Sequence, residues 1–294
     1  MVVLLAGCAR SPERRALDRA NILLDQGRIQ SARETVESCL REHPDSEPLL
    51  RMRVVLLLRE EQLDQAASAM QRVFDDPRIV AETLGHRDRV VRENAAKLIS
   101  DHPGTNDFHE LVRGLNNSDF WVRGYCARAL GRLGNRAALR PLFGLLDDDN
   151  WFVRAEAAMA EGRLGDPRAV GWLVQMLSDP DGNVRYSVAR ALYDLATDSA
   201  RSSLRRALQT APPAQQFYIA VALARNHDPA ALKPLAGAAH DKDPDVRRMV
   251  AQALGECGLP EGTNVLTALL EDTDQTVREQ ARAAMGQIGS RDKE

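Results

Sequence analysis

The sequence predicts an all-α protein, a right-handed α-solenoid built from helical hairpins. The first observation is a repeat, because a Val-Arg pair recurs every 31 residues, with one interval of 62, from Val91 to Arg278. The second is that apolar residues within each copy are spaced by three and four, which is the period of an amphipathic helix. The third is composition: aromatic residues make up only 4% of the chain, and few β-branched runs occur, which disfavours a sheet protein.

The repeat has seven copies, of which the last is truncated. They begin at Asp88, Asp119, Asn150, Asp181, Pro212, Asp243 and Asp274. The recurring arginines are Arg92, Arg123, Arg154, Arg185, Arg247 and Arg278. The fifth copy keeps its apolar positions but has Gln215-Gln216 in place of Val-Arg. This copy is either a worn repeat or a kink in the array.

Each copy is predicted to form two helices. The Asp or Asn at its start is a good N-cap, because its side chain can accept from the free amides of the first turn. In the second copy, Gly131 and Gly134 are expected to end the first helix. The second helix then begins at a capping residue followed by Pro, as in Asp166-Pro167. One hairpin of this size cannot bury its own apolar face, so the copies must stack.

The pattern D-x-x-V-R-x-x-A-x-x-A-L-G-x-L-G-D, kept over residues 88–289, resembles the short HEAT-like repeats first associated with phycobilisome lyase subunits. The resemblance implies that the recurring arginines are structural. They would reach acidic and carbonyl groups of the neighbouring copy and set the register between repeats. A resemblance to this repeat implies a shape rather than an activity.

The N-terminal part has a different period. Gly27, Ala32, Val36, Cys39 and Pro44 are spaced as in a tetratricopeptide repeat, and a degenerate second copy follows 34 residues later. We therefore expect two tetratricopeptide-like units over 13–80 and HEAT-like repeats over 81–294, with a short helix from Asp76-Pro77 to Leu84 between them. Because no Gly/Ser/Pro-rich linker intervenes, the two arrays are expected to be continuous.

The start of the chain bears on location. An apolar run ends in Leu5-Ala6-Gly7-Cys8, which resembles the lipobox of bacterial lipoproteins. The resemblance implies that residues 1–12 are a signal remnant and tether, and that a lipid on Cys8 anchors the protein in the cell envelope, facing the periplasm. Ala9 in place of Asp favours the outer membrane. The alternative is a fortuitous apolar terminus and a cytoplasmic protein, since a basic region is missing and the apolar run is short.

Charge and motifs argue against most chemistry. The net charge is −3, with no long block of like charge, so nucleic acid is not an expected partner. The cysteines form no CxxC pair, and His109-Glu110 is a single example of the paired ligands that HEAT-like deoxyhypusine hydroxylases carry at several repeats. We expect no catalytic residues, cofactor, metal or small-molecule substrate.

Departures from the repeat are the candidate site. Phe120-Trp121 and Trp151-Phe152 occupy the same two positions in successive copies, at the first turn of the first helix. They form either a partner-binding ridge or local core near Trp172. Glu161 interrupts a row of apolar residues; it either contacts a partner, or it turns to water or pairs with an arginine at a frayed helix end.

These features predict a non-catalytic scaffold that binds another protein of the envelope. The alternative is an accessory or chaperone-like subunit of an enzyme, with a lyase-type activity less favoured.

Overall fold

The protein was described from a computed structural model that covers residues 11–71, 77–104 and 107–291. Every regular element in these ranges is a helix, and the predicted all-α solenoid of helical hairpins is confirmed. The chain divides into two compact units, unit 1 up to Ala129 and unit 2 from Leu130. The division falls inside helix α8, so each unit is described by itself.

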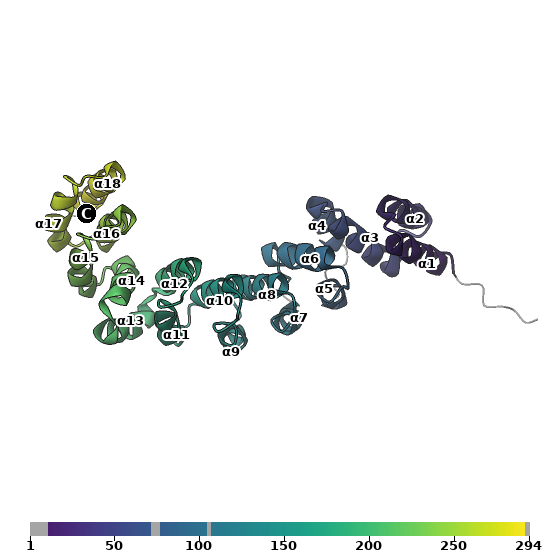
Figure 1. Ribbon diagram of the computed structural model, residues 1–294, viewed down its shortest axis with the longest axis horizontal. Helices are drawn as coiled ribbons and strands as arrows, with labels where there is room; N and C mark the ends of the chain where they lie inside the picture. The colour runs from purple at the N-terminus through teal and green to yellow at the C-terminus, as the bar shows by residue number, and fades with distance from the viewer. Residues whose placement is uncertain (1–10, 72–76, 105–106, 292–294) are drawn as a thin grey trace, which may run out of the picture. The chain divides into compact units, whose positions relative to one another are not determined.

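Unit 1 is a series of helices of 7–14 residues (Figure 1). Its helices are α1 (Pro12–Asp25), α2 (Ile29–Glu42), α3 (Glu47–Arg59), α4 (Leu63–Gln71), α5 (Pro77–Leu84), α6 (Arg89–Asp101), α7 (Phe108–Gly114) and most of α8 (Phe120–Leu133). The pairs α1–α2 and α3–α4 are hairpins in the ranges expected for tetratricopeptide-like units, and α5 is the predicted short helix. That the pairs are tetratricopeptide repeats stays a prediction.

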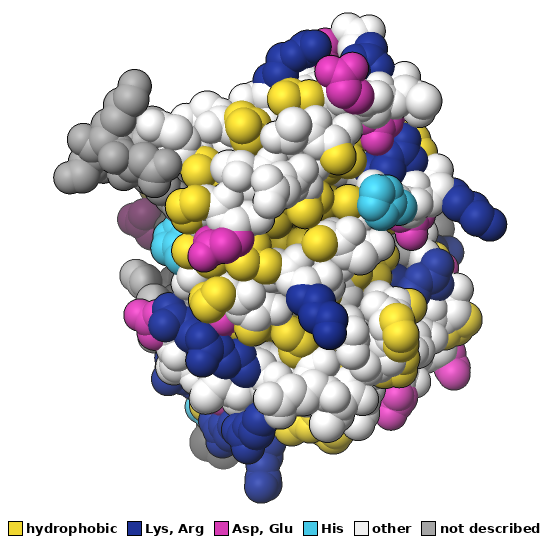
Figure 2. Space-filling view, turned by 90° about the vertical axis from the view of Figure 1, so that its left-hand side faces the viewer, with side chains coloured by type: hydrophobic (Ala, Val, Ile, Leu, Met, Phe, Trp, Pro, Cys, Tyr) yellow, Lys and Arg dark blue, Asp and Glu magenta, His cyan; other side chains and the backbone are white. Residues whose placement is uncertain are grey.

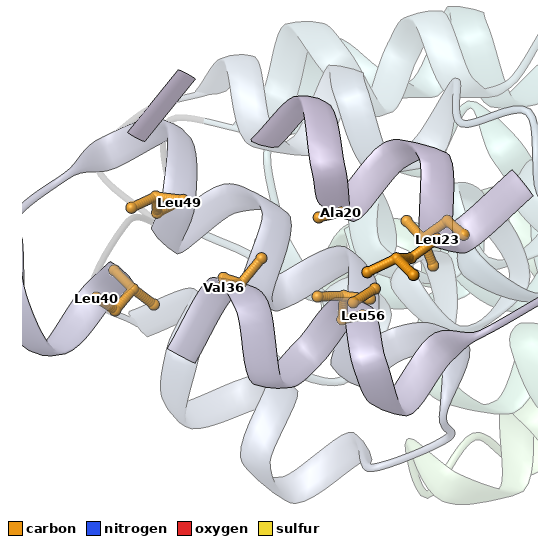
Figure 3. Close-up of a cluster of buried hydrophobic side chains, with 8 residues drawn as sticks. Ala20, Leu23, Val36, Leu40, Leu49 and Leu56 are labelled. Carbon is orange, nitrogen blue, oxygen red and sulfur yellow. The ribbon is translucent and has the colours of Figure 1, made fainter. Parts of the chain in front are cut away.

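The core of unit 1 begins between the first three helices. Ala20 and Leu23 of α1, Val36 of α2 and Leu56 of α3 point toward one another (Figure 3). Ala20, Val36 and Leu56 are fully buried, since the apolar residues of each helix recur every three or four positions and share one face. A hairpin of two helices leaves this face open, and α3 covers it.

Unit 2 contains the larger part of the 31-residue array. Its helices after α8 are α9 (Leu139–Phe143), α10 (Trp151–Leu164), α11 (Ala169–Met176), α12 (Gly182–Leu195), α13 (Asp198–Thr210), α14 (Pro213–Arg225), α15 (Leu232–Ala238), α16 (Pro244–Cys257), α17 (Thr263–Leu269) and α18 (Gln275–Arg291). The even-numbered helices are the first helices of successive copies. They pack on one another in order, and the shorter odd-numbered helices flank them (Figure 1).

The predicted helix starts are confirmed. Asp88, Asn150 and Asp181 each accept the backbone amide two residues later, at 2.8–3.0 Å. The fifth copy begins at Pro212, which supplies no side-chain cap. Some second helices begin in a 3₁₀ turn, as after Asp228, whose carboxylate accepts from the amide of Ala230, whereas after Asp166-Pro167 the helix α11 begins directly at Ala169.

One predicted helix end is wrong. Gly134 lies just beyond α8 with a φ of +67°, the left-handed conformation that glycine adopts most readily. Gly131, by contrast, lies inside α8 and is buried. A Cβ atom at this position would lie 2.6 Å from the Cα atom of Ala160, so glycine is there because two helices approach closely.

None of the helices in the described ranges is long and apolar enough to span a membrane. Figure 2 views the molecule from the side on which α17 lies in Figure 1. Hydrophobic side chains gather across the middle of this face, and most of its basic side chains lie nearer the margins.

Candidate functional site

The two aromatic pairs lie at the first turns of α8 and α10, as predicted. In unit 1, the ring centroids of Phe120 and Trp121 are 5.1 Å apart, and Trp121 stacks on Tyr125 at 5.8 Å. In unit 2, Trp151 is 44% exposed and its ring meets that of Phe152 edge-on. Because the two pairs belong to different units, a single ridge of four rings stays a prediction.

The alternative interpretation placed these rings in local core beside Trp172. Trp172 instead packs against Phe143, with ring centroids 4.3 Å apart, on the second helices α11 and α9. Trp151 is too exposed to be core. The exposed ring therefore remains a candidate partner contact.

Both interpretations of Glu161 need correction. Its side chain is completely buried in α10, and neither carboxylate oxygen has a hydrogen-bond partner among the described residues. Burial raises the pKa of Glu161 to about 8. Glu161 therefore neither turns to water nor pairs with an arginine, and a partner cannot reach it in this conformation. Gly162 does not fray the helix, which continues to Leu164.

The repeat arginines donate to carbonyl groups before their own copy, as the resemblance implied, whereas Asp179 and Asp272 belong to the same copies as the arginines that bind them. Arg154 donates Nε and Nη2 to the two carboxylate oxygens of Asp179 at 2.8 and 2.9 Å, and Arg247 binds Asp272 in the same way at 2.7 and 2.8 Å. Arg92 reaches Asp119 through Nη2 at 3.1 Å. Each also donates Nη1 to two carbonyl oxygens of the loop before its own helix. Arg123 and Arg278 make the same pair of carbonyl bonds.

Arg185 makes only half of this arrangement. Its Nη1 donates to Asp179 O and Pro180 O at 2.7 and 3.0 Å. In the other pairs of unit 2 the acceptor lies 25 residues after the arginine, and here that position is Thr210. No carboxylate of a described residue bonds to the Nε and Nη2 edge of Arg185.

The next copy leaves an acid without its arginine. Asp241 occupies the position of Asp179 and Asp272, but Gln216 replaces the arginine that would bind it. Gln216 donates instead to Ala211 O at 2.9 Å. Arg185 and Asp241 both line a hollow of about 940 Å³, yet no ion pair joins them.

Glycines set the spacing between successive first helices. A Cβ atom at Gly162 would lie 2.6 Å from the Cα atom of Ala191, and one at Gly255 would lie 2.9 Å from the Cα atom of Ala284. At the equivalent position between α12 and α14 the chain has Tyr193. A tyrosine does not fit where even a methyl group collides, and α12 and α14 pack less closely than α10 and α12.

A cleft of about 450 Å³ lies where this close packing is lost, along α12, α14 and α16. Three of the four tyrosines in the chain line it, namely Tyr186, Tyr193 and Tyr218. Tyr186 is 72% exposed, the largest exposed fraction among the large hydrophobic side chains of the described residues. The other residues that line the cleft include three arginines and a methionine, Arg185, Arg190, Arg248 and Met249. We call this the tyrosine cleft.

Tyr193 is fixed in the wall of the tyrosine cleft. The guanidinium of Arg225 lies 4.4 Å from its ring centroid and that of Arg190 lies 5.7 Å away, both within the range of a cation–π contact. Burial, followed by a hydrogen bond to the carboxylate of Glu256, raises the pKa of the Tyr193 hydroxyl. The acid of this cleft is thus engaged by Tyr193, whereas the ring of Tyr186 faces water.

Sequence reasoning missed the tyrosine cleft, although the 31-residue frame carries the signal. One row reads Gly131, Gly162, Tyr193, Ala224, Gly255, and the other reads Asn117, Asp148, Asp179, Thr210, Asp241, Asp272. The glycine row is interrupted at Tyr193 and Ala224 and the aspartate row at Thr210, which all lie in the fourth and fifth copies. Counting what a copy lacks, as well as what it adds, would have found both interruptions.

In the part of the chain that the structure describes, no three His, Cys, Asp or Glu side chains gather where they could hold a metal ion. Glu110, the acid of the single His-Glu pair, bonds Arg113 at 3.0 Å. Burial raises the pKa of the Cys126 thiol to about 12, which makes it a poor nucleophile at neutral pH.

Solved structures from several sources are similar to this chain at low identity. Human deoxyhypusine hydroxylase is 20% identical, with 74% of this chain and 96% of that chain covered and a TM-score of 0.33. The complex of CpcE and CpcF of phycocyanin lyase from Nostoc sp. PCC7120 is 22% identical, with 73% of this chain and 94% of that chain covered and a TM-score of 0.44. The YibA protein of E. coli is 20% identical, with 76% of this chain and 85% of that chain covered and a TM-score of 0.49. No curated protein matches significantly.

The family is shown by the repeat itself. HEAT repeats match residues 77–161, 106–176, 144–216 and 207–286, which together span more than half of the chain. The matches coincide with the helical hairpins from α5 to α18 and with the arginine bonds between copies. This chain belongs to the family of HEAT-repeat proteins.

Proposed function

We propose that this chain is a non-catalytic scaffold that holds another protein, and that the tyrosine cleft of unit 2 is its docking surface. The observation that carries the proposal is the composition of the cleft. Tyrosine, arginine and methionine are the residue types enriched at the centres of protein interfaces, and here they gather along α12, α14 and α16, where the close glycine-mediated packing of unit 2 is lost.

The physical basis is that the array itself does not need these residues. At Gly131, Gly162 and Gly255 the glycine brings adjacent first helices into contact, and the helices bury each other. Tyr193 gives up part of that contact, which costs stability unless something else fills the space. A segment of a partner protein that inserts between Tyr186 and Tyr218 would recover the lost burial. HEAT repeats suit this role, because stacked hairpins present extended surfaces.

The test is site-specific photo-crosslinking in the source cells. A benzophenone side chain at Tyr186 is expected to give a discrete adduct with one protein, and Tyr218→Ser is expected to remove the adduct while leaving the melting temperature within a few degrees. The same probe at Arg206, an exposed residue of α13, is the control and should give none. A probe at Trp151 tests the competing aromatic surface. Adducts from Trp151 and none from Tyr186 would contradict the proposal.

We also propose that the scaffold is anchored in a bacterial envelope through Cys8. The support is the Leu5-Ala6-Gly7-Cys8 pattern, which lies outside the described residues. A lipid-modified cysteine would hold the helical array at the membrane surface without any spanning helix.

Replacing Cys8 by serine is the test of the anchor. The variant is expected to move from the membrane to the soluble fraction and to lose incorporation of labelled palmitate. Serine lacks the sulfur atom through which the lipid would be attached. Cys39→Ser is the matched control, since that cysteine lies in α2 and should leave fractionation unchanged. A Cys8→Ser protein that still pellets with membranes would exclude the lipid anchor.

A further inference from the structure

The unfilled edge of Arg185 points to the chemistry of the partner. We propose that Arg185 binds an Asp or Glu side chain of the segment that docks in the tyrosine cleft, and that this carboxylate takes the place of the aspartate missing at Thr210. The inference rests on the proposed function, because Arg185 lines both the tyrosine cleft and the neighbouring hollow that Gln209 and Pro213 line beside Thr210. It adds which group of the partner is recognised and by which atoms.

The geometry of the expected contact is already present twice in unit 2. Arg154 and Arg247 hold their aspartates through Nε and Nη2 at 2.7–2.9 Å, while Nη1 is occupied by two loop carbonyls. Arg185 makes the same two carbonyl bonds, so its guanidinium is held in place before any ligand arrives. A planar fork that is fixed in advance loses little conformational freedom on binding a carboxylate.

Among the residues that the structure describes, no acid competes for this edge. The sequence position that should supply the acid is Thr210, whose hydroxyl bonds Arg206 O and Ala207 O of its own helix. Asp179 is already bound by Arg154, and only its backbone carbonyl reaches Arg185. Asp241 lines the same hollow as Arg185 but forms no ion pair with it.

The other charges around the cleft are largely balanced by local partners. Arg190 pairs with Asp194 at 3.2 Å, Arg248 with Asp245 at 3.1 Å, and Glu256 accepts from Tyr193. Arg185 is therefore the cation of this surface whose carboxylate is missing. The expected ligand is a segment with one acidic residue next to apolar residues, since Tyr186 and Tyr218 lie beside the fork. A single anchor of this kind, set in an aromatic surround, is typical of an interface hot spot.

The test uses a displayed library of random dodecapeptides, selected on the full chain. Binders that Tyr186→Ser removes define the cleft-directed set, and these are expected to be enriched in one Asp or Glu. Arg185→Gln should weaken representative members by roughly 10- to 100-fold, as expected for losing a bidentate charged hydrogen bond. Changing the acid of such a peptide to its amide should cost the same factor, and the two changes together should cost no more than either alone.

Arg278→Gln is the matched control for stability. Arg278 makes the same two carbonyl bonds, and no carboxylate of a described residue bonds to it, but it lies outside the cleft. It should lose a similar amount of stability and bind the peptides normally. Arg185→Glu gives the converse readout, because selection on it should enrich Lys or Arg.

The outcomes separate the two proposals. Cleft-directed binders without an acidic preference, or binders insensitive to Arg185→Gln, would overturn the role of Arg185 and leave the docking cleft standing. Binders that Tyr186→Ser does not affect would overturn the docking cleft as well. Enrichment of acids that Arg185→Gln abolishes and Arg278→Gln preserves would establish the inference.

Discussion

Replacing Glu161 by leucine is expected to stabilise the protein, and by far more at pH 8.5 than at pH 5. The folded state keeps this acid protonated up to a pKa of about 8, because burial opposes its charge, whereas the unfolded chain ionises it near 4.5. Below pH 4.5 both states hold the proton and no penalty exists. As the pH rises from 4.5 to 8, the unfolded state gains the free energy of ionisation and the folded state does not.

The penalty is therefore complete above pH 8, where it is on the order of 4 kcal/mol. The measurement is the denaturant midpoint of wild type and variant between pH 4.5 and 9. Leucine suits the position because the equivalent residues in neighbouring copies are Leu130 and Leu192, both fully buried. Glu161→Gln separates charge from polarity: like leucine it should remove the pH dependence, but it should stay less stable than the leucine variant by the same amount at every pH, because its buried amide remains polar. A midpoint difference that does not change with pH would show that Glu161 is hydrated.

Replacing Gly162 by alanine is expected to destabilise unit 2 by about 2 kcal/mol, the usual range for forcing extra volume into a packed core. The added methyl group would meet the backbone of α12, with Cα and O of Ala191 at 2.6 and 2.7 Å, and a backbone cannot move aside as a side chain can. The measurement is again the denaturant midpoint. The loss should occur although alanine is the better helix former.

Gly171→Ala is the matched control for that change. Gly171 lies in α11, and a Cβ atom there would meet nothing within 4 Å. Helix propensity alone then acts, and the variant should be more stable by about 0.5–1 kcal/mol. If both glycine variants shift stability in the same direction, close helix approach at Gly162 is not what holds the glycine there.

The fold was predictable because its signal is repeated. One copy of Asp-x-x-Val-Arg would predict little, but the same caps and apolar spacing in successive copies leave only stacked hairpins as a solution. The cap at Asn150 and the bond from Arg154 to Asp179 followed from the same register. The end of α8 was misjudged, because a buried glycine at a helix crossing and a glycine that ends a helix are the same letter in a sequence.

The candidate site was harder to predict for a physical reason. An unusual residue such as Glu161 is conspicuous in sequence, yet the structure buries it. Thr210 and Tyr193 are ordinary residues in themselves. They matter because Thr210 replaces the aspartate of the repeat and Tyr193 replaces its glycine. The effect of a missing residue depends on which group loses its partner. To predict that effect, one must know the distance between two helices or the direction in which a guanidinium edge points.

The wedge at Tyr193 has a mechanical consequence. In an array of stacked hairpins, bending stiffness depends on how closely each pair of neighbouring helices is locked together. Gly162 and Gly255 give two tight joints, and the two joints between them, at Tyr193 and Ala224, are looser. We expect unit 2 to flex there first when it is pulled or twisted. A ligand that filled the tyrosine cleft would then restrict bending at these joints, and its binding would make unit 2 stiffer.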